Sequence, residues 1–213
     1  MRVTGGILRG RQVVVPKGDQ VRPTQDRVRL ALFSSLGTCV ERCRFLDVFA
    51  GSGAVGLEAW SRGAAAVWWV EADRAVYSVL AENVHRLCGG PERGRGRPDR
   101  SGEAAPEARP PDAGGETRLI RSDALGFLEK TDREERFDLV FADPPYDREG
   151  NRSWPGRLLA AMDNHRVLAE RGTVILEQGT QDPLVVPAGW RVRWDRTYGE
   201  TRLLSFARDP EAR

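Results

Sequence analysis

The sequence is poor in cysteine, histidine and lysine, and it has no long hydrophobic run. Its three cysteines, Cys39, Cys43 and Cys88, show no C-x-x-C spacing, and neither His85 nor His165 lies close enough to suggest a quartet of metal ligands. This pattern predicts no metal site and no disulfide framework. The longest apolar run, residues 64–70, is far shorter than the ~20 residues of a membrane helix, and the first residues lack a signal-peptide core. We therefore expect a cytoplasmic protein without a membrane segment.

Apolar residues are also missing from one internal stretch. Between Gly89 and Glu116 the chain has no Leu, Ile, Val, Phe, Trp or Tyr, so residues 89–116 are predicted to be a disordered insertion. The composition of the whole chain, 40% hydrophobic and 30% charged over 213 residues, predicts one large globular domain or one core domain with a small appendage. We divide the chain into a basic N-terminal arm, 1–24, and a domain, 25–213.

Positive charge is concentrated at the start of the chain. Residues 1–36 contain seven basic and two acidic residues, a net +5, whereas the remaining residues carry −3. All but two of the basic residues in the chain are arginines, whose planar guanidinium suits bidentate phosphate contacts. This asymmetry predicts a nucleic-acid surface. The candidate contacts are Arg2, Arg9, Arg11, Arg22 and Arg27.

Hydrophobic periodicity predicts an α/β fold. Thr24 offers a cap for an amphipathic helix over 25–36, and helical patterns alternate with apolar runs from residue 45 onward. The predicted strands are 45–50, 67–70, 117–121, 137–142, 173–177, 191–195 and 202–207, with a further short strand at 12–15 in the arm or a small hairpin. The alternation predicts a mainly parallel sheet of about seven strands, closed by a terminal hairpin.

A glycine-rich turn follows the first of these strands. Gly51, Gly53 and Gly56 have the G-x-G-x-x-G spacing after Asp47, and Glu71 closes the next strand about 20 residues later. Glycines there permit a tight turn and a close approach of ligand to backbone. The same pattern suits a nicotinamide dinucleotide or S-adenosylmethionine, whose ribose hydroxyls the acid would hold. Glycine spacing does not separate these two cofactors.

Two further acids follow predicted strands. Asp123 could accept a hydrogen bond from an adenine amine or could simply cap a helix. Asp143 begins the motif Asp143-Pro144-Pro145-Tyr146. The prolines fix the backbone and leave carbonyl acceptors beside the carboxylate, and the tyrosine offers a flat face for a base. This combination predicts a site that orients an exocyclic base amine for in-line methyl transfer.

With these motifs, the chain resembles the bacterial guanine-N2 methyltransferases of 16S ribosomal RNA, the RsmD family. The resemblance spans nearly the whole chain apart from 89–116. Besides the motifs at 47–53 and 143–146, it rests on Met1-Arg2-Val3, Gly5-Gly6, Arg9-Gly10-Arg11 and Pro16, on the block 22–29 with Leu32-Phe33, and on Tyr198-Gly199-Glu200-Thr201.

The resemblance implies a Rossmann-like class I S-adenosylmethionine-dependent methyltransferase fold. The implied substrate is the N2 amine of a guanine in 16S rRNA, guanine 966 in the standard numbering of that RNA, within a small-subunit ribonucleoprotein particle. We expect a monomer. The candidate catalytic residues are Asp143, Pro144, Pro145 and Tyr146, and the candidate cofactor residues are Thr24, Asp47, Gly51, Gly53, Glu71 and Asp123.

Three other functions remain open from the sequence. An adenine-N6 DNA methyltransferase would use the same chemistry at Asp143, but its target-recognition domain needs more chain. An NAD-dependent oxidoreductase would not explain the motif at 143–146 and lacks a histidine or lysine near it. A non-catalytic RNA-binding protein would explain the basic arm alone.

Overall fold

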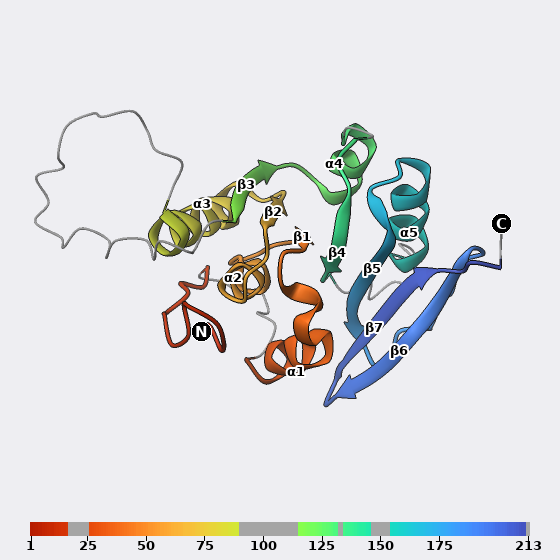
Figure 1. Cartoon of the computed structure of the whole chain (residues 1–213), viewed down its shortest axis with the longest axis horizontal. Helices are drawn as coiled ribbons and strands as arrows, with labels where there is room; N and C mark the ends of the chain where they lie inside the picture. Colours follow the sequence, from red (N-terminus) through yellow and green to blue (C-terminus); the bar gives the residue numbers. More distant parts are fainter. Residues whose placement is uncertain (17–25, 90–114, 132–133, 146–153, 212–213) are drawn as a thin grey trace, which may run out of the picture.

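The structure is a computed structural model that describes residues 1–16, 26–89, 115–131, 134–145 and 154–211. Seven strands form one sheet in the order β3-β2-β1-β4-β5-β7-β6 (Figure 1). They are β1 Arg44–Val48, β2 Ala66–Glu71, β3 Glu116–Arg121, β4 Phe137–Ala142, β5 Leu168–Gly179, β6 Trp190–Tyr198 and β7 Thr201–Arg208. The first five strands pair in parallel, and β7 pairs antiparallel with both β5 and β6. The predicted mainly parallel sheet with a terminal hairpin is confirmed.

Helices cover both faces of the sheet. They are α1 Asp26–Leu36, α2 Ala54–Ser61, α3 Arg74–Val84, α4 Ala124–Lys130 and α5 Trp154–Asn164, with the short helices η1 Gly37–Val40 and η2 His85–Gly89. The buried side chains of α1, α2 and α3 belong to one hydrophobic cluster, whereas those of α4 and α5 belong to a second. Because both faces are covered, β1, β2 and β4 are buried almost throughout, which explains why apolar residues predominate in them.

The N-terminal segment is a small closed hairpin rather than a free arm. The backbone N–H of Val3 donates to the carbonyl of Arg11 at 3.0 Å, and that of Gly10 donates to Val3 at 2.9 Å. The strand predicted at 12–15 is wrong, because this segment pairs only through one isolated bridge between Arg2 and Gln12. Apolar side chains of the hairpin instead point inward: Val3, Leu8 and Val13 are buried in the cluster under α1, α2 and α3.

A buried polar group fastens this hairpin to the domain. The Glu58 carboxylate of α2 accepts from the Thr4 backbone N–H and hydroxyl, both at 2.7 Å, and from the Nε of Arg62 at 2.9 Å. It also accepts from the Nε of Arg29 on α1 at 3.4 Å. Ser61 extends the attachment, since its hydroxyl donates to Gly5 and accepts from the N–H of Leu8. The hairpin therefore has a fixed position relative to α1 and α2.

Some of the predicted segments lie partly outside the residues that the structure describes. The helix predicted over 25–36 is confirmed as α1, although Gln25 and its proposed cap Thr24 lie outside the described residues. The interior of the predicted insertion 89–116 also lies outside them; Gly89 ends η2 and Glu116 begins β3. The division at residue 24 stays a prediction. Across the described ranges, none of the helices has the length and hydrophobicity that crossing a membrane requires.

Candidate active site

Four acidic residues lie at or next to the carboxyl ends of neighbouring strands. Asp47 is in β1 and Glu71 ends β2, Asp143 directly follows β4, and Glu177 is near the end of β5. These strands are parallel and adjacent in the order β2-β1-β4-β5, so their carboxyl ends share one edge of the sheet. In open α/β sheets this edge is where ligands bind.

The glycine turn is shaped by close packing. Gly51 and Gly53 have φ values of +54° and +81°, a region that favours glycine, and Gly53 caps the start of α2. A Cβ on Gly56 would lie 2.1 Å from the indole nitrogen of Trp69 on β2. The backbone N–H of Gly56 donates to the buried Asp47 carboxylate at 3.0 Å. Asp47 thus holds the first turn of α2 against the end of β1.

Glu71 is tied to the same turn. One oxygen of its carboxylate accepts from the backbone N–H of Gly51 at 3.0 Å, and the other accepts from the N–H of Asp73 at 2.9 Å. Each carboxylate oxygen has a further lone pair, so Glu71 can still accept from ligand hydroxyls. The structure therefore brings Asp47, Gly51, Gly53 and Glu71 together, as the sequence predicts.

Two of the four acids at this edge of the sheet have raised pKa values. Burial raises the pKa of Asp47 to about 7, against the lowering effect of the Gly56 N–H, and the charge of Glu71 adds to the rise. Burial likewise raises the pKa of Asp143 well above its usual range, and the nearby carboxylates of Glu177 and Asp47 raise it further. Such a set of carboxylates fits a ligand that carries hydroxyls and positive charge, which is the character of S-adenosylmethionine.

Asp123 acts as a helix cap in this structure. It precedes α4, is exposed, and accepts from the backbone N–H of Gly126 at 2.8 Å. A Cβ on Gly126 would lie 2.7 Å from the second carboxylate oxygen, so glycine allows this cap. Of the two roles that the sequence leaves open, the structure confirms the cap; the contact with an adenine amine stays a prediction.

The motif at 143–146 begins where β4 ends. Asp143 and Pro144 are partly exposed and Pro145 is exposed, so carbonyl acceptors lie beside the carboxylate. Tyr146 lies outside the described residues, as do Thr24 and Arg22. Sequence reasoning missed Glu177, although its signal is the same as for Asp47: an acid within a few residues of the end of an apolar strand.

The basic residues of the predicted nucleic-acid surface are on the outside of the protein. Arg2, Arg9 and Arg11 are exposed on the N-terminal hairpin, and Arg27 is exposed on α1. Arg2 also donates to the Gly10 carbonyl at 2.7 Å and so closes the hairpin. Their exposure leaves these guanidinium groups accessible to a large polyanion, and their contacts with RNA stay predictions.

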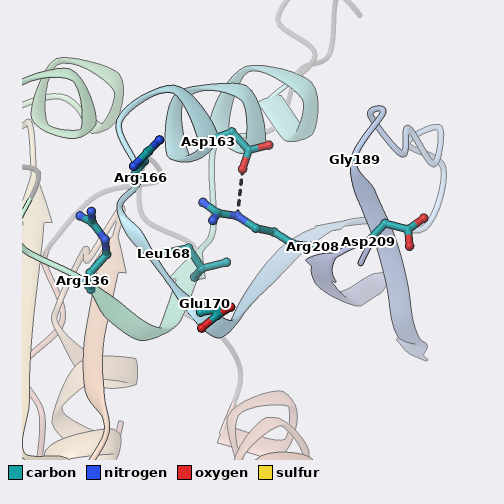
Figure 2. Close-up of a pocket in the computed structure, with 8 residues that line it drawn as sticks. All are labelled: Arg136, Asp163, Arg166, Leu168, Glu170, Gly189, Arg208 and Asp209. Carbon is teal, nitrogen blue, oxygen red and sulfur yellow. Dashed lines mark ion pairs between the residues drawn. The ribbon is translucent and has the colours of Figure 1, made fainter. Parts of the chain in front are cut away.

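A cavity of about 640 Å³ lies at the opposite edge of the sheet (Figure 2). It is lined by Arg136, Asp163, Arg166, Leu168, Glu170, Gly189, Arg208 and Asp209. Its three arginines are balanced by three acids, and Asp163 pairs with Arg208 at 3.0 Å. Leu168 begins β5, whereas Asp143 follows the end of the parallel strand β4. This cavity is therefore separate from the edge of the sheet where the four acids lie.

Cysteine chemistry plays no part in this arrangement. The three cysteines are free; Cys39 is exposed, whereas Cys43 and Cys88 are buried. Burial raises the pKa of the Cys43 thiol to about 12, which keeps it protonated and unreactive. In the part of the chain that the structure describes, no cluster of His, Cys, Asp and Glu could hold a metal ion.

Comparison with known proteins gives matches over nearly the whole chain. Residues 1–95 and 108–207 match the protein family described as conserved hypothetical protein 95. The chain is 30% identical over 212 residues, 99% of this chain and 91% of the relative, to ribosomal RNA small subunit methyltransferase D of Escherichia coli strain K12. The protein of the same name from Haemophilus influenzae is 29% identical over 200 residues, 93% and 89% of the two chains. A solved structure, "Putative methyltransferase yhhF from Escherichia coli", has a TM-score of 0.74 at 30% identity and 98% coverage of both chains.

Proposed function

This chain belongs to the protein family described as conserved hypothetical protein 95, and from that premise we propose that it methylates small-subunit ribosomal RNA with S-adenosylmethionine as donor. Relatives named as small subunit rRNA methyltransferases support this substrate class. The proposed acceptor is the exocyclic N2 amine of a guanine, guanine 966 in the standard numbering of 16S rRNA. We place the reaction in the cytoplasm, on a small-subunit particle, with the enzyme as a monomer.

The position of Asp143 carries the proposal. It leaves β4 at the ligand-binding edge and is followed by two prolines, which have no backbone N–H. The Asp143 carboxylate and the Pro144 carbonyl can therefore each accept one N–H of an aromatic amine. Accepting both hydrogens would direct the nitrogen lone pair out of the ring plane, toward a methyl donor.

Asp143 would also take up the proton that the amine loses. Methyl transfer would form a new N–C bond as the bond between sulfur and the methyl group breaks, its electron pair staying on sulfur, and would leave the nitrogen with a positive charge and a surplus proton. A carboxylate whose pKa is raised by burial and by Glu177 and Asp47 accepts such a proton more readily than an ordinary one does. No second base is required, because the proton can pass from Asp143 to water after the transfer.

The other carboxylates and the glycine turn would hold the cofactor. Glu71 would bind the ribose hydroxyls, while Asp47, Gly51 and Gly53 shape the turn that adjoins them. When bound, S-adenosylmethionine supplies an electrophilic methyl group on a positively charged sulfur. A nicotinamide dinucleotide would instead bring a pyrophosphate dianion toward Asp47, Glu71, Asp143 and Glu177, which disfavours the oxidoreductase alternative.

Two measurements test this function. Calorimetry with the purified chain should show saturable binding of S-adenosylmethionine and none of NAD; the opposite result would reject the proposal. Small-subunit particles from a strain that lacks this gene should then be incubated with enzyme and cofactor, and the digested RNA analysed by mass spectrometry. We expect N2-methylguanosine. A parallel incubation with DNA that yields N6-methyl-2′-deoxyadenosine, with no methylated guanosine in the RNA, would support the adenine alternative.

A further inference from the structure

One face of β6 carries an alternating row of Trp194, Arg196 and Tyr198. Residues two apart on a strand point to the same face, and these three are opposite Ser205, Leu203 and Thr201 of β7. Trp194 and Tyr198 are partly buried against the cluster under α1, α2 and α3, whereas Arg196 is exposed. We call these three residues the β6 strip.

The β6 strip faces α1. The Arg196 guanidinium lies over the Trp194 ring, 5.3 Å from its centroid, and it donates to the hydroxyl of Ser35 on α1. Figure 1 shows the tip of the β6–β7 hairpin beside this helix. The same helix carries the exposed Arg27 near its start.

The strip also reaches the edge of the sheet where Asp143 lies. Thr201, which follows the turn after Tyr198, pairs with Gly179 at the carboxyl end of β5. The turn is fixed there, because the backbone N–H of Thr180 donates to the Glu200 carbonyl at 3.0 Å. As β4 and β5 are parallel, the carboxyl end of β5 and Asp143 share one edge.

Within β6, no uncompensated acid opposes the positive charge of the strip. Its basic residues are Arg191, Arg193 and Arg196, and its single acid is Asp195. Asp195 is opposite Leu204, on the other face of the hairpin from the strip, and its two oxygens bind the Nε and Nη2 of Arg202 at 2.9 and 2.5 Å. The acid is thus neutralised by a bidentate pair, and the strip itself carries only positive charge.

We propose that Trp194, Arg196 and Tyr198 bind unpaired nucleotides of the RNA that flank the target base. The proposal rests on the proposed function and names a second contact, separate from the N-terminal hairpin. Aromatic rings at alternate positions of a strand offer stacking faces for successive bases, and an arginine between them can stack or bind phosphate. Such a row holds single-stranded RNA next to the catalytic motif without reading its sequence.

Substitutions in the full-length chain test the strip. A fluorescein-labelled single-stranded oligoribonucleotide is the probe, and fluorescence anisotropy measures its affinity. Arg196→Ala and Tyr198→Ala should each weaken binding about tenfold, the size expected for the loss of one base stack. Tyr198→Phe should regain most of the affinity, because the ring remains. Arg191→Ala is the matched control, an exposed arginine at the other end of β6, and it should change affinity less than twofold.

A second measurement does not depend on the folding of any variant. The wild-type chain is cross-linked by ultraviolet light to the same RNA containing 5-iodouracil, which reacts with aromatic side chains, and the cross-linked peptides are mapped by mass spectrometry. We expect cross-links at Trp194 or Tyr198. Cross-links confined to other peptides, or unchanged affinity of both alanine variants, would overturn the proposal.

Failure of the strip and failure of the proposed function give different results. Suppose that the wild-type enzyme methylates the particle and that Arg196→Ala binds RNA and methylates as well as wild type does. The proposed role of the strip is then wrong, and the proposed function stands. If the variant loses RNA affinity but the wild-type enzyme transfers no methyl group, the proposed RNA contact of the strip stands and the proposed function is wrong. Weaker binding to the particle with unchanged affinity for naked RNA would assign the strip to a protein partner and overturn the proposal.

Discussion

Arg29 and Glu58 form an ion pair in which neither side chain is exposed to solvent. Arg29 lies on α1 and Glu58 on α2, and the same carboxylate binds Thr4 of the N-terminal hairpin. Three segments that are distant in sequence therefore meet at one buried charge. Removing Glu58 deprives the buried Arg29 of this partner and leaves its pair with Asp26 at 2.9 Å; breaking a buried ion pair in this way is strongly destabilising.

Glu58→Gln should lower the free energy of unfolding by about 3–5 kcal/mol, the usual cost of breaking a buried ion pair. Urea denaturation measures the change. The matched control is Arg62→Met, which removes a partner of the same carboxylate whose side chain is 24% exposed; it should cost about 1 kcal/mol or less. Equal losses in both variants would show that burial of Glu58 is not the source of the effect.

The stability of the protein should fall as pH rises from about 4 to about 7. The pKa of Asp47 is 3.8 in its ordinary state and about 7 in the fold, so the folded chain binds more protons than the unfolded chain across this window. The loss of folding free energy that comes from burying the Asp47 charge is absent below the lower pKa. It is complete above the higher pKa, where it reaches roughly 4 kcal/mol. Asp47→Asn should remove it.

Urea denaturation at pH 5 and pH 8 checks this expectation. Asp47→Asn should gain stability relative to wild type at pH 8, and the gain should be smaller at pH 5. Asp143 also has a raised pKa and is retained in the variant, so some pH dependence should remain. An identical pH slope in the two proteins would contradict the prediction.

Asp143→Ala should lower methyl transfer by about 10²-fold or more, because the group acts chiefly on the transition state. Asp143→Asn should retain partial activity, since an amide keeps one acceptor but can also present a donor. Tyr146→Phe should be milder still, because the stacking face remains. Single-turnover methylation of a small-subunit particle measures the order, with affinity for S-adenosylmethionine as the control. Transfer by Asp143→Ala at the wild-type rate would disprove this role for Asp143.

Replacing Arg9, Arg11 and Arg22 together with alanine should weaken RNA binding and flatten its dependence on salt, because each phosphate contact releases counterions. Cofactor affinity should be unchanged. A control triple variant at Arg166, Arg171 and Arg191, exposed arginines away from α1 and the N-terminal hairpin, should keep the wild-type salt slope. Identical slopes for all three proteins would reject the N-terminal surface as an RNA contact.

Deleting residues 91–114 should leave the melting temperature and the turnover nearly unchanged, because this sequence has no large apolar side chain to add to a core. The deletion stops before Gly115, whose carbonyl accepts from the indole of Trp60 at 3.4 Å and where a Cβ would lie 2.5 Å from the Ala64 carbonyl. A shift of the melting temperature by more than a few degrees would show that the insertion is structural.

The sheet could be predicted because strands covered on both faces are mostly apolar, as at 67–70 and, apart from Asp138, at 137–142. The sequence predicts that β5 begins at Thr173, but it begins at Leu168, because Glu170 and Arg171 are polar and exposed and interrupt the apolar pattern. The strand predicted at 12–15 is absent. Val13 packs into the domain whereas Val14 is exposed, and strand propensity does not register such a tertiary contact.

The glycine turn and its acids could be predicted because their spacing follows from the βαβ unit itself. The contacts among Thr4, Arg29 and Glu58 could not, since they join residues 29 and 54 positions apart. Asp123 was ambiguous for another reason: a strand-end carboxylate that caps a helix and one that binds a ligand have the same local sequence.

The irregular pairing of β6 also bears on how the protein behaves at high concentration. β6 is the last strand of the sheet, and its register with β7 shifts between Val192 and Trp194, which makes Arg193 an extra residue. A straight outer strand invites a second chain to extend the sheet, whereas a bulge twists it and charged side chains repel an identical neighbour. With Arg191, Arg193 and Arg196 along it, this border disfavours edge-to-edge pairing between copies of the chain.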